Sequence, residues 1–369
     1  MVELANLFPR HGLAVTVVLI EPPAKPPSFA AAVSRSMASN PRIAFHAEIN
    51  ASFGEIGDEP LLFPGVPPFK PSDLPKAALD RNDEMYRWIL GVFERLPESR
   101  GILVNTFQWL ETKALRALGD GACVVGRPTP PVCCVGPLVS RGGEDKNHGC
   151  LSWLDAQPER SVVFLCFGSM GSFPKEQLEE IAIGLERSGQ RFLWVVRRPH
   201  AGEASLSGLL GGRHGTHDEL DIDEFMPEGF LERTKGRGLV AGSWAPQADV
   251  LRHRATGAFV THCGWNSVLE GIAAGVPLLC WPLYAEQRLN KVFIVEEVGV
   301  GAVMVGYDGE VVSAEEVEAK VRWMLESNEA SPIRERVALA KERAEEATRK
   351  SGSSHQSFVK FLTDFGVTK

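Results

Sequence analysis

The second half of the chain alternates between short apolar runs and segments of helical periodicity, and this pattern constrains the fold most. Residues 161–167 form a continuous apolar run, which is typical of a strand buried on both faces of a parallel sheet. Similar runs predict strands at 192–196, 238–241, 258–261 and 277–281. Helices are expected between or after them at 174–185, 267–274 and 287–297. Strands that alternate with helices indicate an α/β fold with a parallel sheet covered on both faces.

The first half of the chain contains fewer strand signals. We expect strands at 13–20, 42–46 and 101–105, and helices at 2–8, 83–96 and 112–118. About three good strands are fewer than the five or six usual for a doubly wound sheet, so this domain is expected to be incomplete. Glycine, proline and polar residues predict loops or linkers at 47–75, 128–149 and 201–223. Two charged helices at 313–350 and a last helix at 355–365 follow.

A length of 369 residues fits about two domains. We expect an incomplete N-terminal domain over residues 1–135 and a linker over 136–150. A second Rossmann-like domain is expected over 151–350, and a C-terminal helix over 351–369 that packs back toward the first domain.

Charge and cysteine content exclude several classes of protein. The net charge is −8 and the basic residues are scattered, which argues against nucleic-acid binding. No apolar run approaches 18 residues, so we expect no membrane-spanning helix. We expect no targeting signal either, because Glu3 lies where a signal peptide has a basic leader and Glu21-Pro-Pro-Ala replaces a cleavage site after the run 13–20. The seven cysteines are odd in number and lack a Cys-x-x-Cys pair, which favours structural thiols in a reducing compartment. His200, His214, His217 and Asp218 are the residues that could be considered for a zinc site. They lie in a glycine-rich loop that has no scaffold to hold the ligands, so no metal site is expected.

The segment 244–287 has the residues that a nucleotide-sugar site needs. Trp244 offers a flat face on which a base can stack. A strand that ends at Thr261 leads through a turn into a helix, and such a turn directs backbone N–H groups at a diphosphate. Gly264 permits close approach of the backbone, and Ser267 is suited either to cap the helix or to bind phosphate. Glu270 is placed to accept hydrogen bonds from ribose hydroxyls.

This segment resembles the signature region of the plant secondary-product UDP-glycosyltransferases, a family that includes flavonoid and anthocyanidin glucosyltransferases. The similarity extends to Pro64-Gly-Val-Pro-Pro, Gly101-Ile-Leu-Val-Asn-Thr-Phe and Ser161-Val-Val-Phe-Leu-Cys-Phe-Gly-Ser. The resemblance implies a GT-B fold, in which two Rossmann-like domains face each other across a cleft. It also implies that the C-terminal domain holds most of the donor.

The family's donor contacts can be placed on this sequence residue by residue. The resemblance assigns uracil and ribose to Trp244, Ala245, Gln247 and Glu270, and the diphosphate to Ser169, His262, Asn266 and Ser267. It assigns the sugar to Trp265, Glu286 and Gln287, with Gly264 and Tyr284 in the same donor-binding set. A glutamine at the position of Gln287 generally accompanies glucose, so the donor substrate is expected to be UDP-glucose. No cofactor and no metal are expected.

The resemblance implies an inverting mechanism in which a histidine, oriented by an aspartate, takes a proton from the acceptor hydroxyl. The family's histidine precedes the helix expected at 2–8, and its aspartate lies between the equivalents of Phe45 and Pro64. Only about 18 residues join those two positions here, too few for the expected strand and helix. We therefore expect both catalytic residues to be absent from this sequence. His46 is a weak substitute, with Glu48 or Asp58 nearby in sequence.

Three hypotheses follow. The first is a UDP-glucose-dependent glucosyltransferase that acts on a hydroxyl of a small phenolic acceptor such as a flavonoid. The alternative is a catalytically inactive remnant that only binds UDP-sugar, and a third is an epimerase of related architecture. Members of the family are usually monomeric and cytosolic, so we expect a cytoplasmic monomer with no nucleic-acid or membrane partner.

Overall fold

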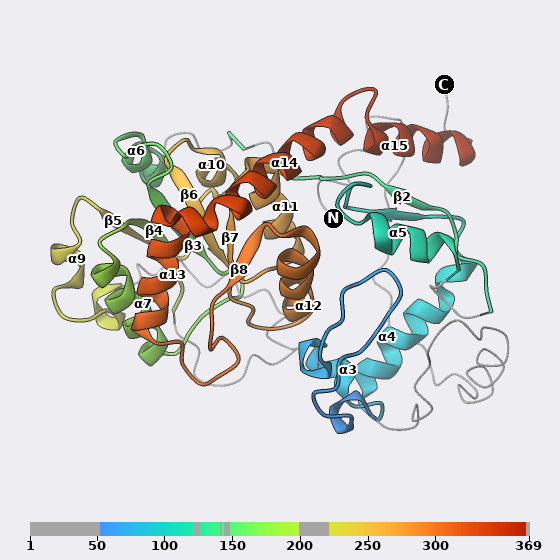
Figure 1. The fold of residues 1–369 in the computed structure, drawn as a ribbon, viewed down its shortest axis with the longest axis horizontal. Helices are drawn as coiled ribbons and strands as arrows, with labels where there is room; N and C mark the ends of the chain where they lie inside the picture. Colours follow the sequence, from blue (N-terminus) through green and yellow to red (C-terminus); the bar gives the residue numbers. More distant parts are fainter. Residues whose placement is uncertain (1–51, 122–125, 141, 144–147, 199–220, 367–369) are drawn as a thin grey trace. The chain divides into compact units, whose positions relative to one another are not determined.

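The computed structural model describes residues 52–121, 126–140, 142–143, 148–198 and 221–366, which form two compact units (Figure 1). The first unit comprises residues up to 139, 284–297 and those from 342 onward. The second comprises residues 140–283 and 298–341. Each unit contains a parallel sheet, with two strands described in the first and six in the second.

The sheet of the second unit has the strand order β5-β4-β3-β6-β7-β8. Its strands are β3 (Val162–Cys166), β4 (Arg191–Val196), β5 (Gly238–Gly242), β6 (Thr256–Thr261), β7 (Leu278–Cys280) and β8 (Gly301–Val303). All neighbours pair in parallel, and Cys166 of β3 lies opposite Thr261 of β6. The chain runs outward from β3 to β5, returns to β6 beside β3, and then runs outward to β8. Such a reversal leaves a crevice at the carboxyl ends of the two central strands.

Helices cover this sheet. They are α6 (Gly149–Asp155), α7 (Lys175–Ser188), α9 (Phe230–Arg233), α10 (Gln247–Arg252), α11 (Trp265–Ala274), α13 (Ala314–Glu326) and the first part of α14 (Ser331–Thr348), which belongs to this unit up to Lys341. Leu178, Ile181 and Leu185 of α7 are fully buried in the core, as their helical spacing predicts. Gly184 allows α7 to approach α13 closely, because a Cβ there would lie 2.6 Å from the Val317 Cβ.

In the first unit, β1 (Ile102–Val104) pairs in parallel with β2 (Val132–Cys134). The helices are α3 (Lys76–Leu79), α4 (Glu84–Arg95), α5 (Thr112–Gly119), α12 (Gln287–Val292) and α15 (Ser353–Asp364). Short 3-10 helices lie at Phe53–Glu55, Pro71–Asp73 and Leu96–Glu98. Phe358 and Leu362 of α15 pack with Val135 in a small buried cluster next to β2.

Within the described residues, most of the elements expected from the sequence are confirmed to within about three residues at each end. One prediction was wrong: part of the stretch 128–149, expected to be a linker, forms β2. The helix expected at 287–297 is confirmed, as an α-helix up to Val292 that continues as a π-helix at Phe293–Val298. The sequence also gave no signal for β8. The elements expected at 2–8, 13–20 and 42–46, and nearly all of the loop 201–223, lie outside the described residues.

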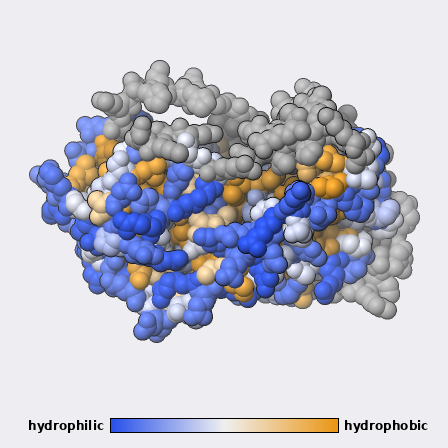
Figure 2. All heavy atoms as spheres, turned by 90° about the horizontal axis from the view of Figure 1, so that it is seen from above, coloured by the Kyte–Doolittle hydropathy of each residue, from blue (hydrophilic) through white to orange (hydrophobic). Residues whose placement is uncertain are grey.

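The polarity of the surface and the cysteines of the described residues can be compared with what the composition predicts. Among the coloured residues of the face drawn in Figure 2, hydrophilic ones predominate and hydrophobic ones lie between them. No helix among the described residues has the length and apolar character needed to cross a membrane. The six described cysteines are free and buried, and no group of three or more potential metal-ligating side chains occurs in the described part of the chain.

Candidate functional site

The carboxyl ends of β3, β4, β5 and β6 open onto a cavity of about 380 Å³, which lies entirely in the second unit. This is the position at which open α/β sheets bind ligands. Its lining residues are Cys166, Gly168, Ser169, Val195, Arg197, Trp244, Ala245, Gln247, His262, Gly264, Trp265, Asn266, Ser267 and Glu270. Ten residues predicted from the sequence to bind the donor are therefore brought together: Ser169, Trp244, Ala245, Gln247, His262, Gly264, Trp265, Asn266, Ser267 and Glu270.

The His262 imidazole forms part of the cavity wall and lies close to two glycines. A Cβ at Gly168 would lie 2.6 Å from His262 Nε2, and a Cβ at Gly264 would lie closer still. The sequence interpretation assigned Gly264 to close approach of the backbone to a diphosphate, and in the structure its missing side chain also makes room for this ring. Burial lowers the pKa of His262 to about 4, so the imidazole is uncharged at neutral pH. Any hydrogen bond that it donates to a phosphate comes from a neutral ring.

Helix α11 begins at Trp265, with Gly264 as its N-cap and no side-chain cap. The backbone N–H groups of its first turn therefore lie next to the cavity without a capping side chain, and the positive end of the helix dipole lies there too. The suggestion that Ser267 caps this helix was wrong, because the helix begins two residues earlier than expected. Ser267 is buried in the first turn, and its Oγ accepts a hydrogen bond from Gln247.

Gln247 joins the first turn of α10 to α11. Its Nε2 donates to Ser267 Oγ at 2.9 Å and to Glu270 Oε2 at 2.7 Å. Both acceptors belong to α11, one turn apart, so the amide holds the Glu270 carboxylate in a defined orientation at the cavity wall. A carboxylate held in this way is suited to accept hydrogen bonds from vicinal hydroxyls.

Trp244 presents its indole to solvent, with 53% of the residue exposed. Its ring meets the ring of His148 edge-on, with 5.5 Å between centroids. The preceding residue, Ser243, has a φ of +65°, which a non-glycine residue rarely adopts. The backbone of Ser243 is held by an N–H to Val196 O hydrogen bond of 2.7 Å. An exposed aromatic face on a tightly held turn is suited to stacking on a base.

Backbone strain concentrates near the predicted donor residues. Among the described residues, the non-glycine residues with positive φ are Arg160, Ser243, Cys263 and Ala285. Three of these four directly adjoin a residue predicted to bind the donor. Strained backbone of this kind persists where the surrounding structure holds it in place, and it is common at functional sites.

The remaining predicted donor residues, Tyr284, Glu286 and Gln287, belong to the first unit. Gln287 is buried at the start of α12, and its Oε1 accepts a 2.9 Å hydrogen bond from the Tyr284 N–H. His46, the weak candidate for a catalytic base, lies outside the described residues. The sequence prediction also missed Arg197, which directly follows β4 and lines the cavity, and His148, which contacts Trp244 but is not among the lining residues.

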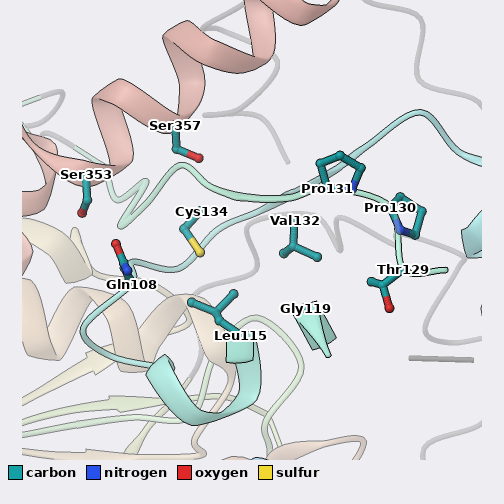
Figure 3. A pocket seen from close by; sticks show the side chains of 10 residues that line it. All are labelled: Gln108, Leu115, Gly119, Thr129, Pro130, Pro131, Val132, Cys134, Ser353 and Ser357. Atoms are coloured by element: carbon teal, nitrogen blue, oxygen red, sulfur yellow. The ribbon is translucent and has the colours of Figure 1, made fainter. Parts of the chain in front are cut away.

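A larger cavity of about 440 Å³ lies in the first unit (Figure 3). Its wall includes Leu115 of α5, Cys134 of β2, and Ser353 and Ser357 of α15. Burial, with smaller contributions from Glu111 and Cys133, raises the pKa of the Cys134 thiol to about 11, so this thiol is protonated and unreactive at neutral pH. None of the described residues that line this cavity is charged, so its size does not make it a site for a diphosphate.

Comparison with known proteins identifies the family. The family described as "UDP-glucoronosyl and UDP-glucosyl transferase" matches residues 127–329, which is more than half of the chain. The chain belongs to this family. Relatives within the UDP-glycosyltransferases include the anthocyanidin 5,3-O-glucosyltransferase of a Rosa hybrid cultivar, 46% identical over 86% of this chain and 64% of the relative. They also include the phloretin 2'-O-glucosyltransferase of Pyrus communis, 46% identical over 90% of this chain and 70% of the relative.

The fold agrees with this assignment to the UDP-glycosyltransferases. UGT2 of Phytolacca americana, solved as a complex with UDP-2fluoro-glucose and pterostilbene, superimposes with a TM-score of 0.75 at 38% sequence identity. The similarity covers 86% of this chain and 66% of that protein. The GT-B fold class expected from the sequence is confirmed. Across these comparisons the chain spans between 64% and 70% of its relatives' length, and thus less than two thirds of some of them.

Proposed function

We propose that the chain is a UDP-glucose-dependent glucosyltransferase of the plant type, which transfers glucose to a hydroxyl of a small phenolic acceptor with inversion. The observation that carries the proposal is the cavity at the carboxyl ends of β3 and β6. In the proposed reaction the acceptor oxygen forms a bond to the anomeric carbon, the bond to the diphosphate breaks, and the acceptor proton passes to a base. UDP leaves with the electron pair of the broken bond.

The geometry of the cavity supports the donor half of this proposal. Trp244 supplies the face for uracil, and Glu270, fixed by Gln247, accepts from the ribose hydroxyls. The uncapped first turn of α11 and the neutral His262 ring supply N–H donors for the diphosphate. Gln287 supports glucose rather than galactose as the transferred sugar, because the related enzymes with a glutamine at this position generally use UDP-glucose.

The acceptor class is supported by the relatives. The names of two of them specify an anthocyanidin and phloretin, and the Phytolacca americana structure contains pterostilbene. All three compounds are phenolic. A flavonoid or a related phenolic is therefore the acceptor that we propose.

A second candidate function is binding of UDP-sugar without transfer. It is favoured by the short stretch between Phe45 and Pro64, which lacks the length for the family's aspartate segment. Under this hypothesis the donor cavity remains a binding module. We further propose a monomer in the cytoplasm, without nucleic-acid partners. The six free cysteines of the described part support a reducing compartment, and the net charge of −8 disfavours nucleic acid.

The test combines calorimetric titration of UDP with mass spectrometry of reactions that contain UDP-glucose and a phenolic panel. Parallel reactions with UDP-galactose test the donor preference. Glucosides above the level of a heat-denatured control would support the transferase, and His46→Ala would then test the weak candidate base. Binding of UDP without any glucoside would support the binding module, and failure to bind UDP would refute both functions.

A further inference from the structure

The donor cavity contains a cationic side chain to which the family resemblance gave no role. Arg197 directly follows β4 and lines the cavity. Its Nε donates a 2.9 Å hydrogen bond to the carbonyl oxygen of Gly168, in the turn that also carries Ser169. The two terminal nitrogens of the guanidinium carry its remaining N–H donors.

The charges of the cavity make this residue distinctive. Among the described residues that line the cavity, Arg197 is the only one with a permanent positive charge. His262 is uncharged at neutral pH, and Glu270 adds a negative charge. A diphosphate bound without a metal ion needs positive charge from the protein, and a helix N-terminus supplies only about half an elementary charge.

The position of Arg197 fits this need, because the groups around it are contiguous. Gly168, which accepts from Arg197, borders one side of the His262 ring. Gly264, which is the N-cap of α11, borders the same ring. The guanidinium, the Ser169 turn, the imidazole and the start of α11 therefore form one continuous wall of the cavity.

We propose that Arg197 binds the diphosphate of the UDP-sugar and supplies positive charge to UDP as it leaves. The inference rests on the proposed function, because it requires a nucleoside diphosphate in this cavity. Arginine suits the role because its guanidinium remains protonated and forms paired hydrogen bonds with phosphate oxygens.

A purely structural role would also explain the hydrogen bond to Gly168, and the two roles differ in what they do to ligand binding. If Arg197 only braces the turn, its loss perturbs the whole cavity and weakens uridine and UDP alike. If Arg197 binds the diphosphate, its loss weakens UDP and leaves uridine, which has no phosphate, nearly unchanged.

The experiment is calorimetric titration of the wild-type chain and three variants with UDP and with uridine. Arg197→Gln removes the charge, and Arg197→Lys retains it without the guanidinium geometry. Arg198→Gln is the matched control, because it makes the same change in net charge at the neighbouring exposed residue, outside the cavity lining. Thermal unfolding of each variant checks that it folds.

We expect Arg197→Gln to weaken UDP binding about 10- to 100-fold, the effect typical of losing a charged hydrogen bond, with uridine affinity changed less than about 3-fold. Arg197→Lys should recover most of the loss, and Arg198→Gln should match the wild type. The UDP affinity of the wild type should also fall more steeply with salt than that of Arg197→Gln.

Equal weakening of UDP and uridine in Arg197→Gln would overturn the inference and leave Arg197 as a brace for the Gly168 turn. Unchanged UDP affinity in this variant would overturn it as well. If the wild type binds uridine and UDP with the same affinity, the cavity is no diphosphate site and the inference fails. If the wild type binds neither ligand, the proposed function is refuted, and this inference, which depends on it, is refuted as well.

Discussion

The close packing of His262 against Gly264 leads to a quantitative prediction for Gly264→Ala. A Cβ at this position would meet the imidazole at a distance that real Cβ atoms do not show. The ring is buried and also lies close to Gly168, so relieving the clash requires the ring to shift at the cavity wall. The φ of Gly264 is −61°, a value that alanine adopts without strain. The variant therefore isolates the clash with the ring from backbone effects.

The expected magnitude follows from three contributions. Overpacking of a close-packed site costs about 1–3 kcal/mol. Alanine is a poorer N-cap than glycine by about 0.5–1 kcal/mol. The loss of chain entropy in the unfolded state stabilises the variant by about 0.4–1 kcal/mol. The last two nearly cancel, so Gly264→Ala should destabilise the second unit by about 1–3 kcal/mol. In a His262→Ala background the clash is absent, and the same change should cost close to nothing.

Hydrogen exchange of peptides that cover β6 and α11 measures this double-mutant cycle in the full chain. We expect a coupling energy of about 1–3 kcal/mol between the two substitutions, well above the deviation from additivity seen for independent sites. Gly168→Ala is a useful contrast. Its φ of +76° adds a backbone cost that His262→Ala should not relieve. Equal penalties for Gly264→Ala in the two backgrounds would refute the idea that the glycine makes room for the ring.

Three further predictions follow from the described contacts. Burial lowers the pKa of His262 to about 4 from its ordinary 6.5, so stability should fall as pH drops from about 6.5 toward 4. Between pH 7 and pH 5 the wild type should lose about 2 kcal/mol more than His262→Gln in urea unfolding, and equal losses would contradict the assignment. Asp73→Asn removes the carboxylate partner of Lys291 in a 2.9 Å buried ion pair of the first unit. It should cost about 3 kcal/mol by thermal unfolding, and Asp73→Leu with Lys291→Met should recover most of it, whereas no recovery would argue against the pair. Trp244→Ala should weaken UDP and uridine alike by about 10-fold in titration while Trp244→Phe binds nearly normally, and a loss confined to UDP would argue against base stacking.

The sheet of the second unit was predictable from the sequence because its central strands are buried on both faces. Strands β3 and β6 are buried along their length, and such burial favours apolar runs that are easily recognised, Val162–Cys166 in β3 and the three residues 258–260 in β6. Strands β2 and β8 are as short as β1 and β7, but β2 is flanked by prolines and β8 begins at a glycine, and these residues favour loops in a sequence pattern. Their place is fixed by pairing with β1 and β7, which is information that a local pattern does not contain.

The donor cavity was largely predictable because most of its lining residues are close together in the sequence, between Trp244 and Glu270. The sequence did not predict Arg197 as a cavity residue, because its partner Gly168 is 29 residues away and only the pairing of β3 with β4 brings the two together. The misassignment of Ser267 has a local cause. The helix begins after Gly264 without a serine, threonine, aspartate or asparagine at its N-cap, so the usual sequence signal for a helix start is missing.

The interleaving of the two units has a consequence for the order in which they are completed during synthesis. All described residues of the second unit precede residue 342, whereas the first unit also needs the segment from Glu342 onward, which includes α15. Translation proceeds at about 5–20 residues per second, so the second unit is fully synthesised seconds before α15 can reach β2. All the segments that form the cavity of the second unit are thus synthesised before the last segment of the unit that begins earlier in the chain. A stalled or shortened message that ends near residue 341 would yield the cavity without a finished first unit.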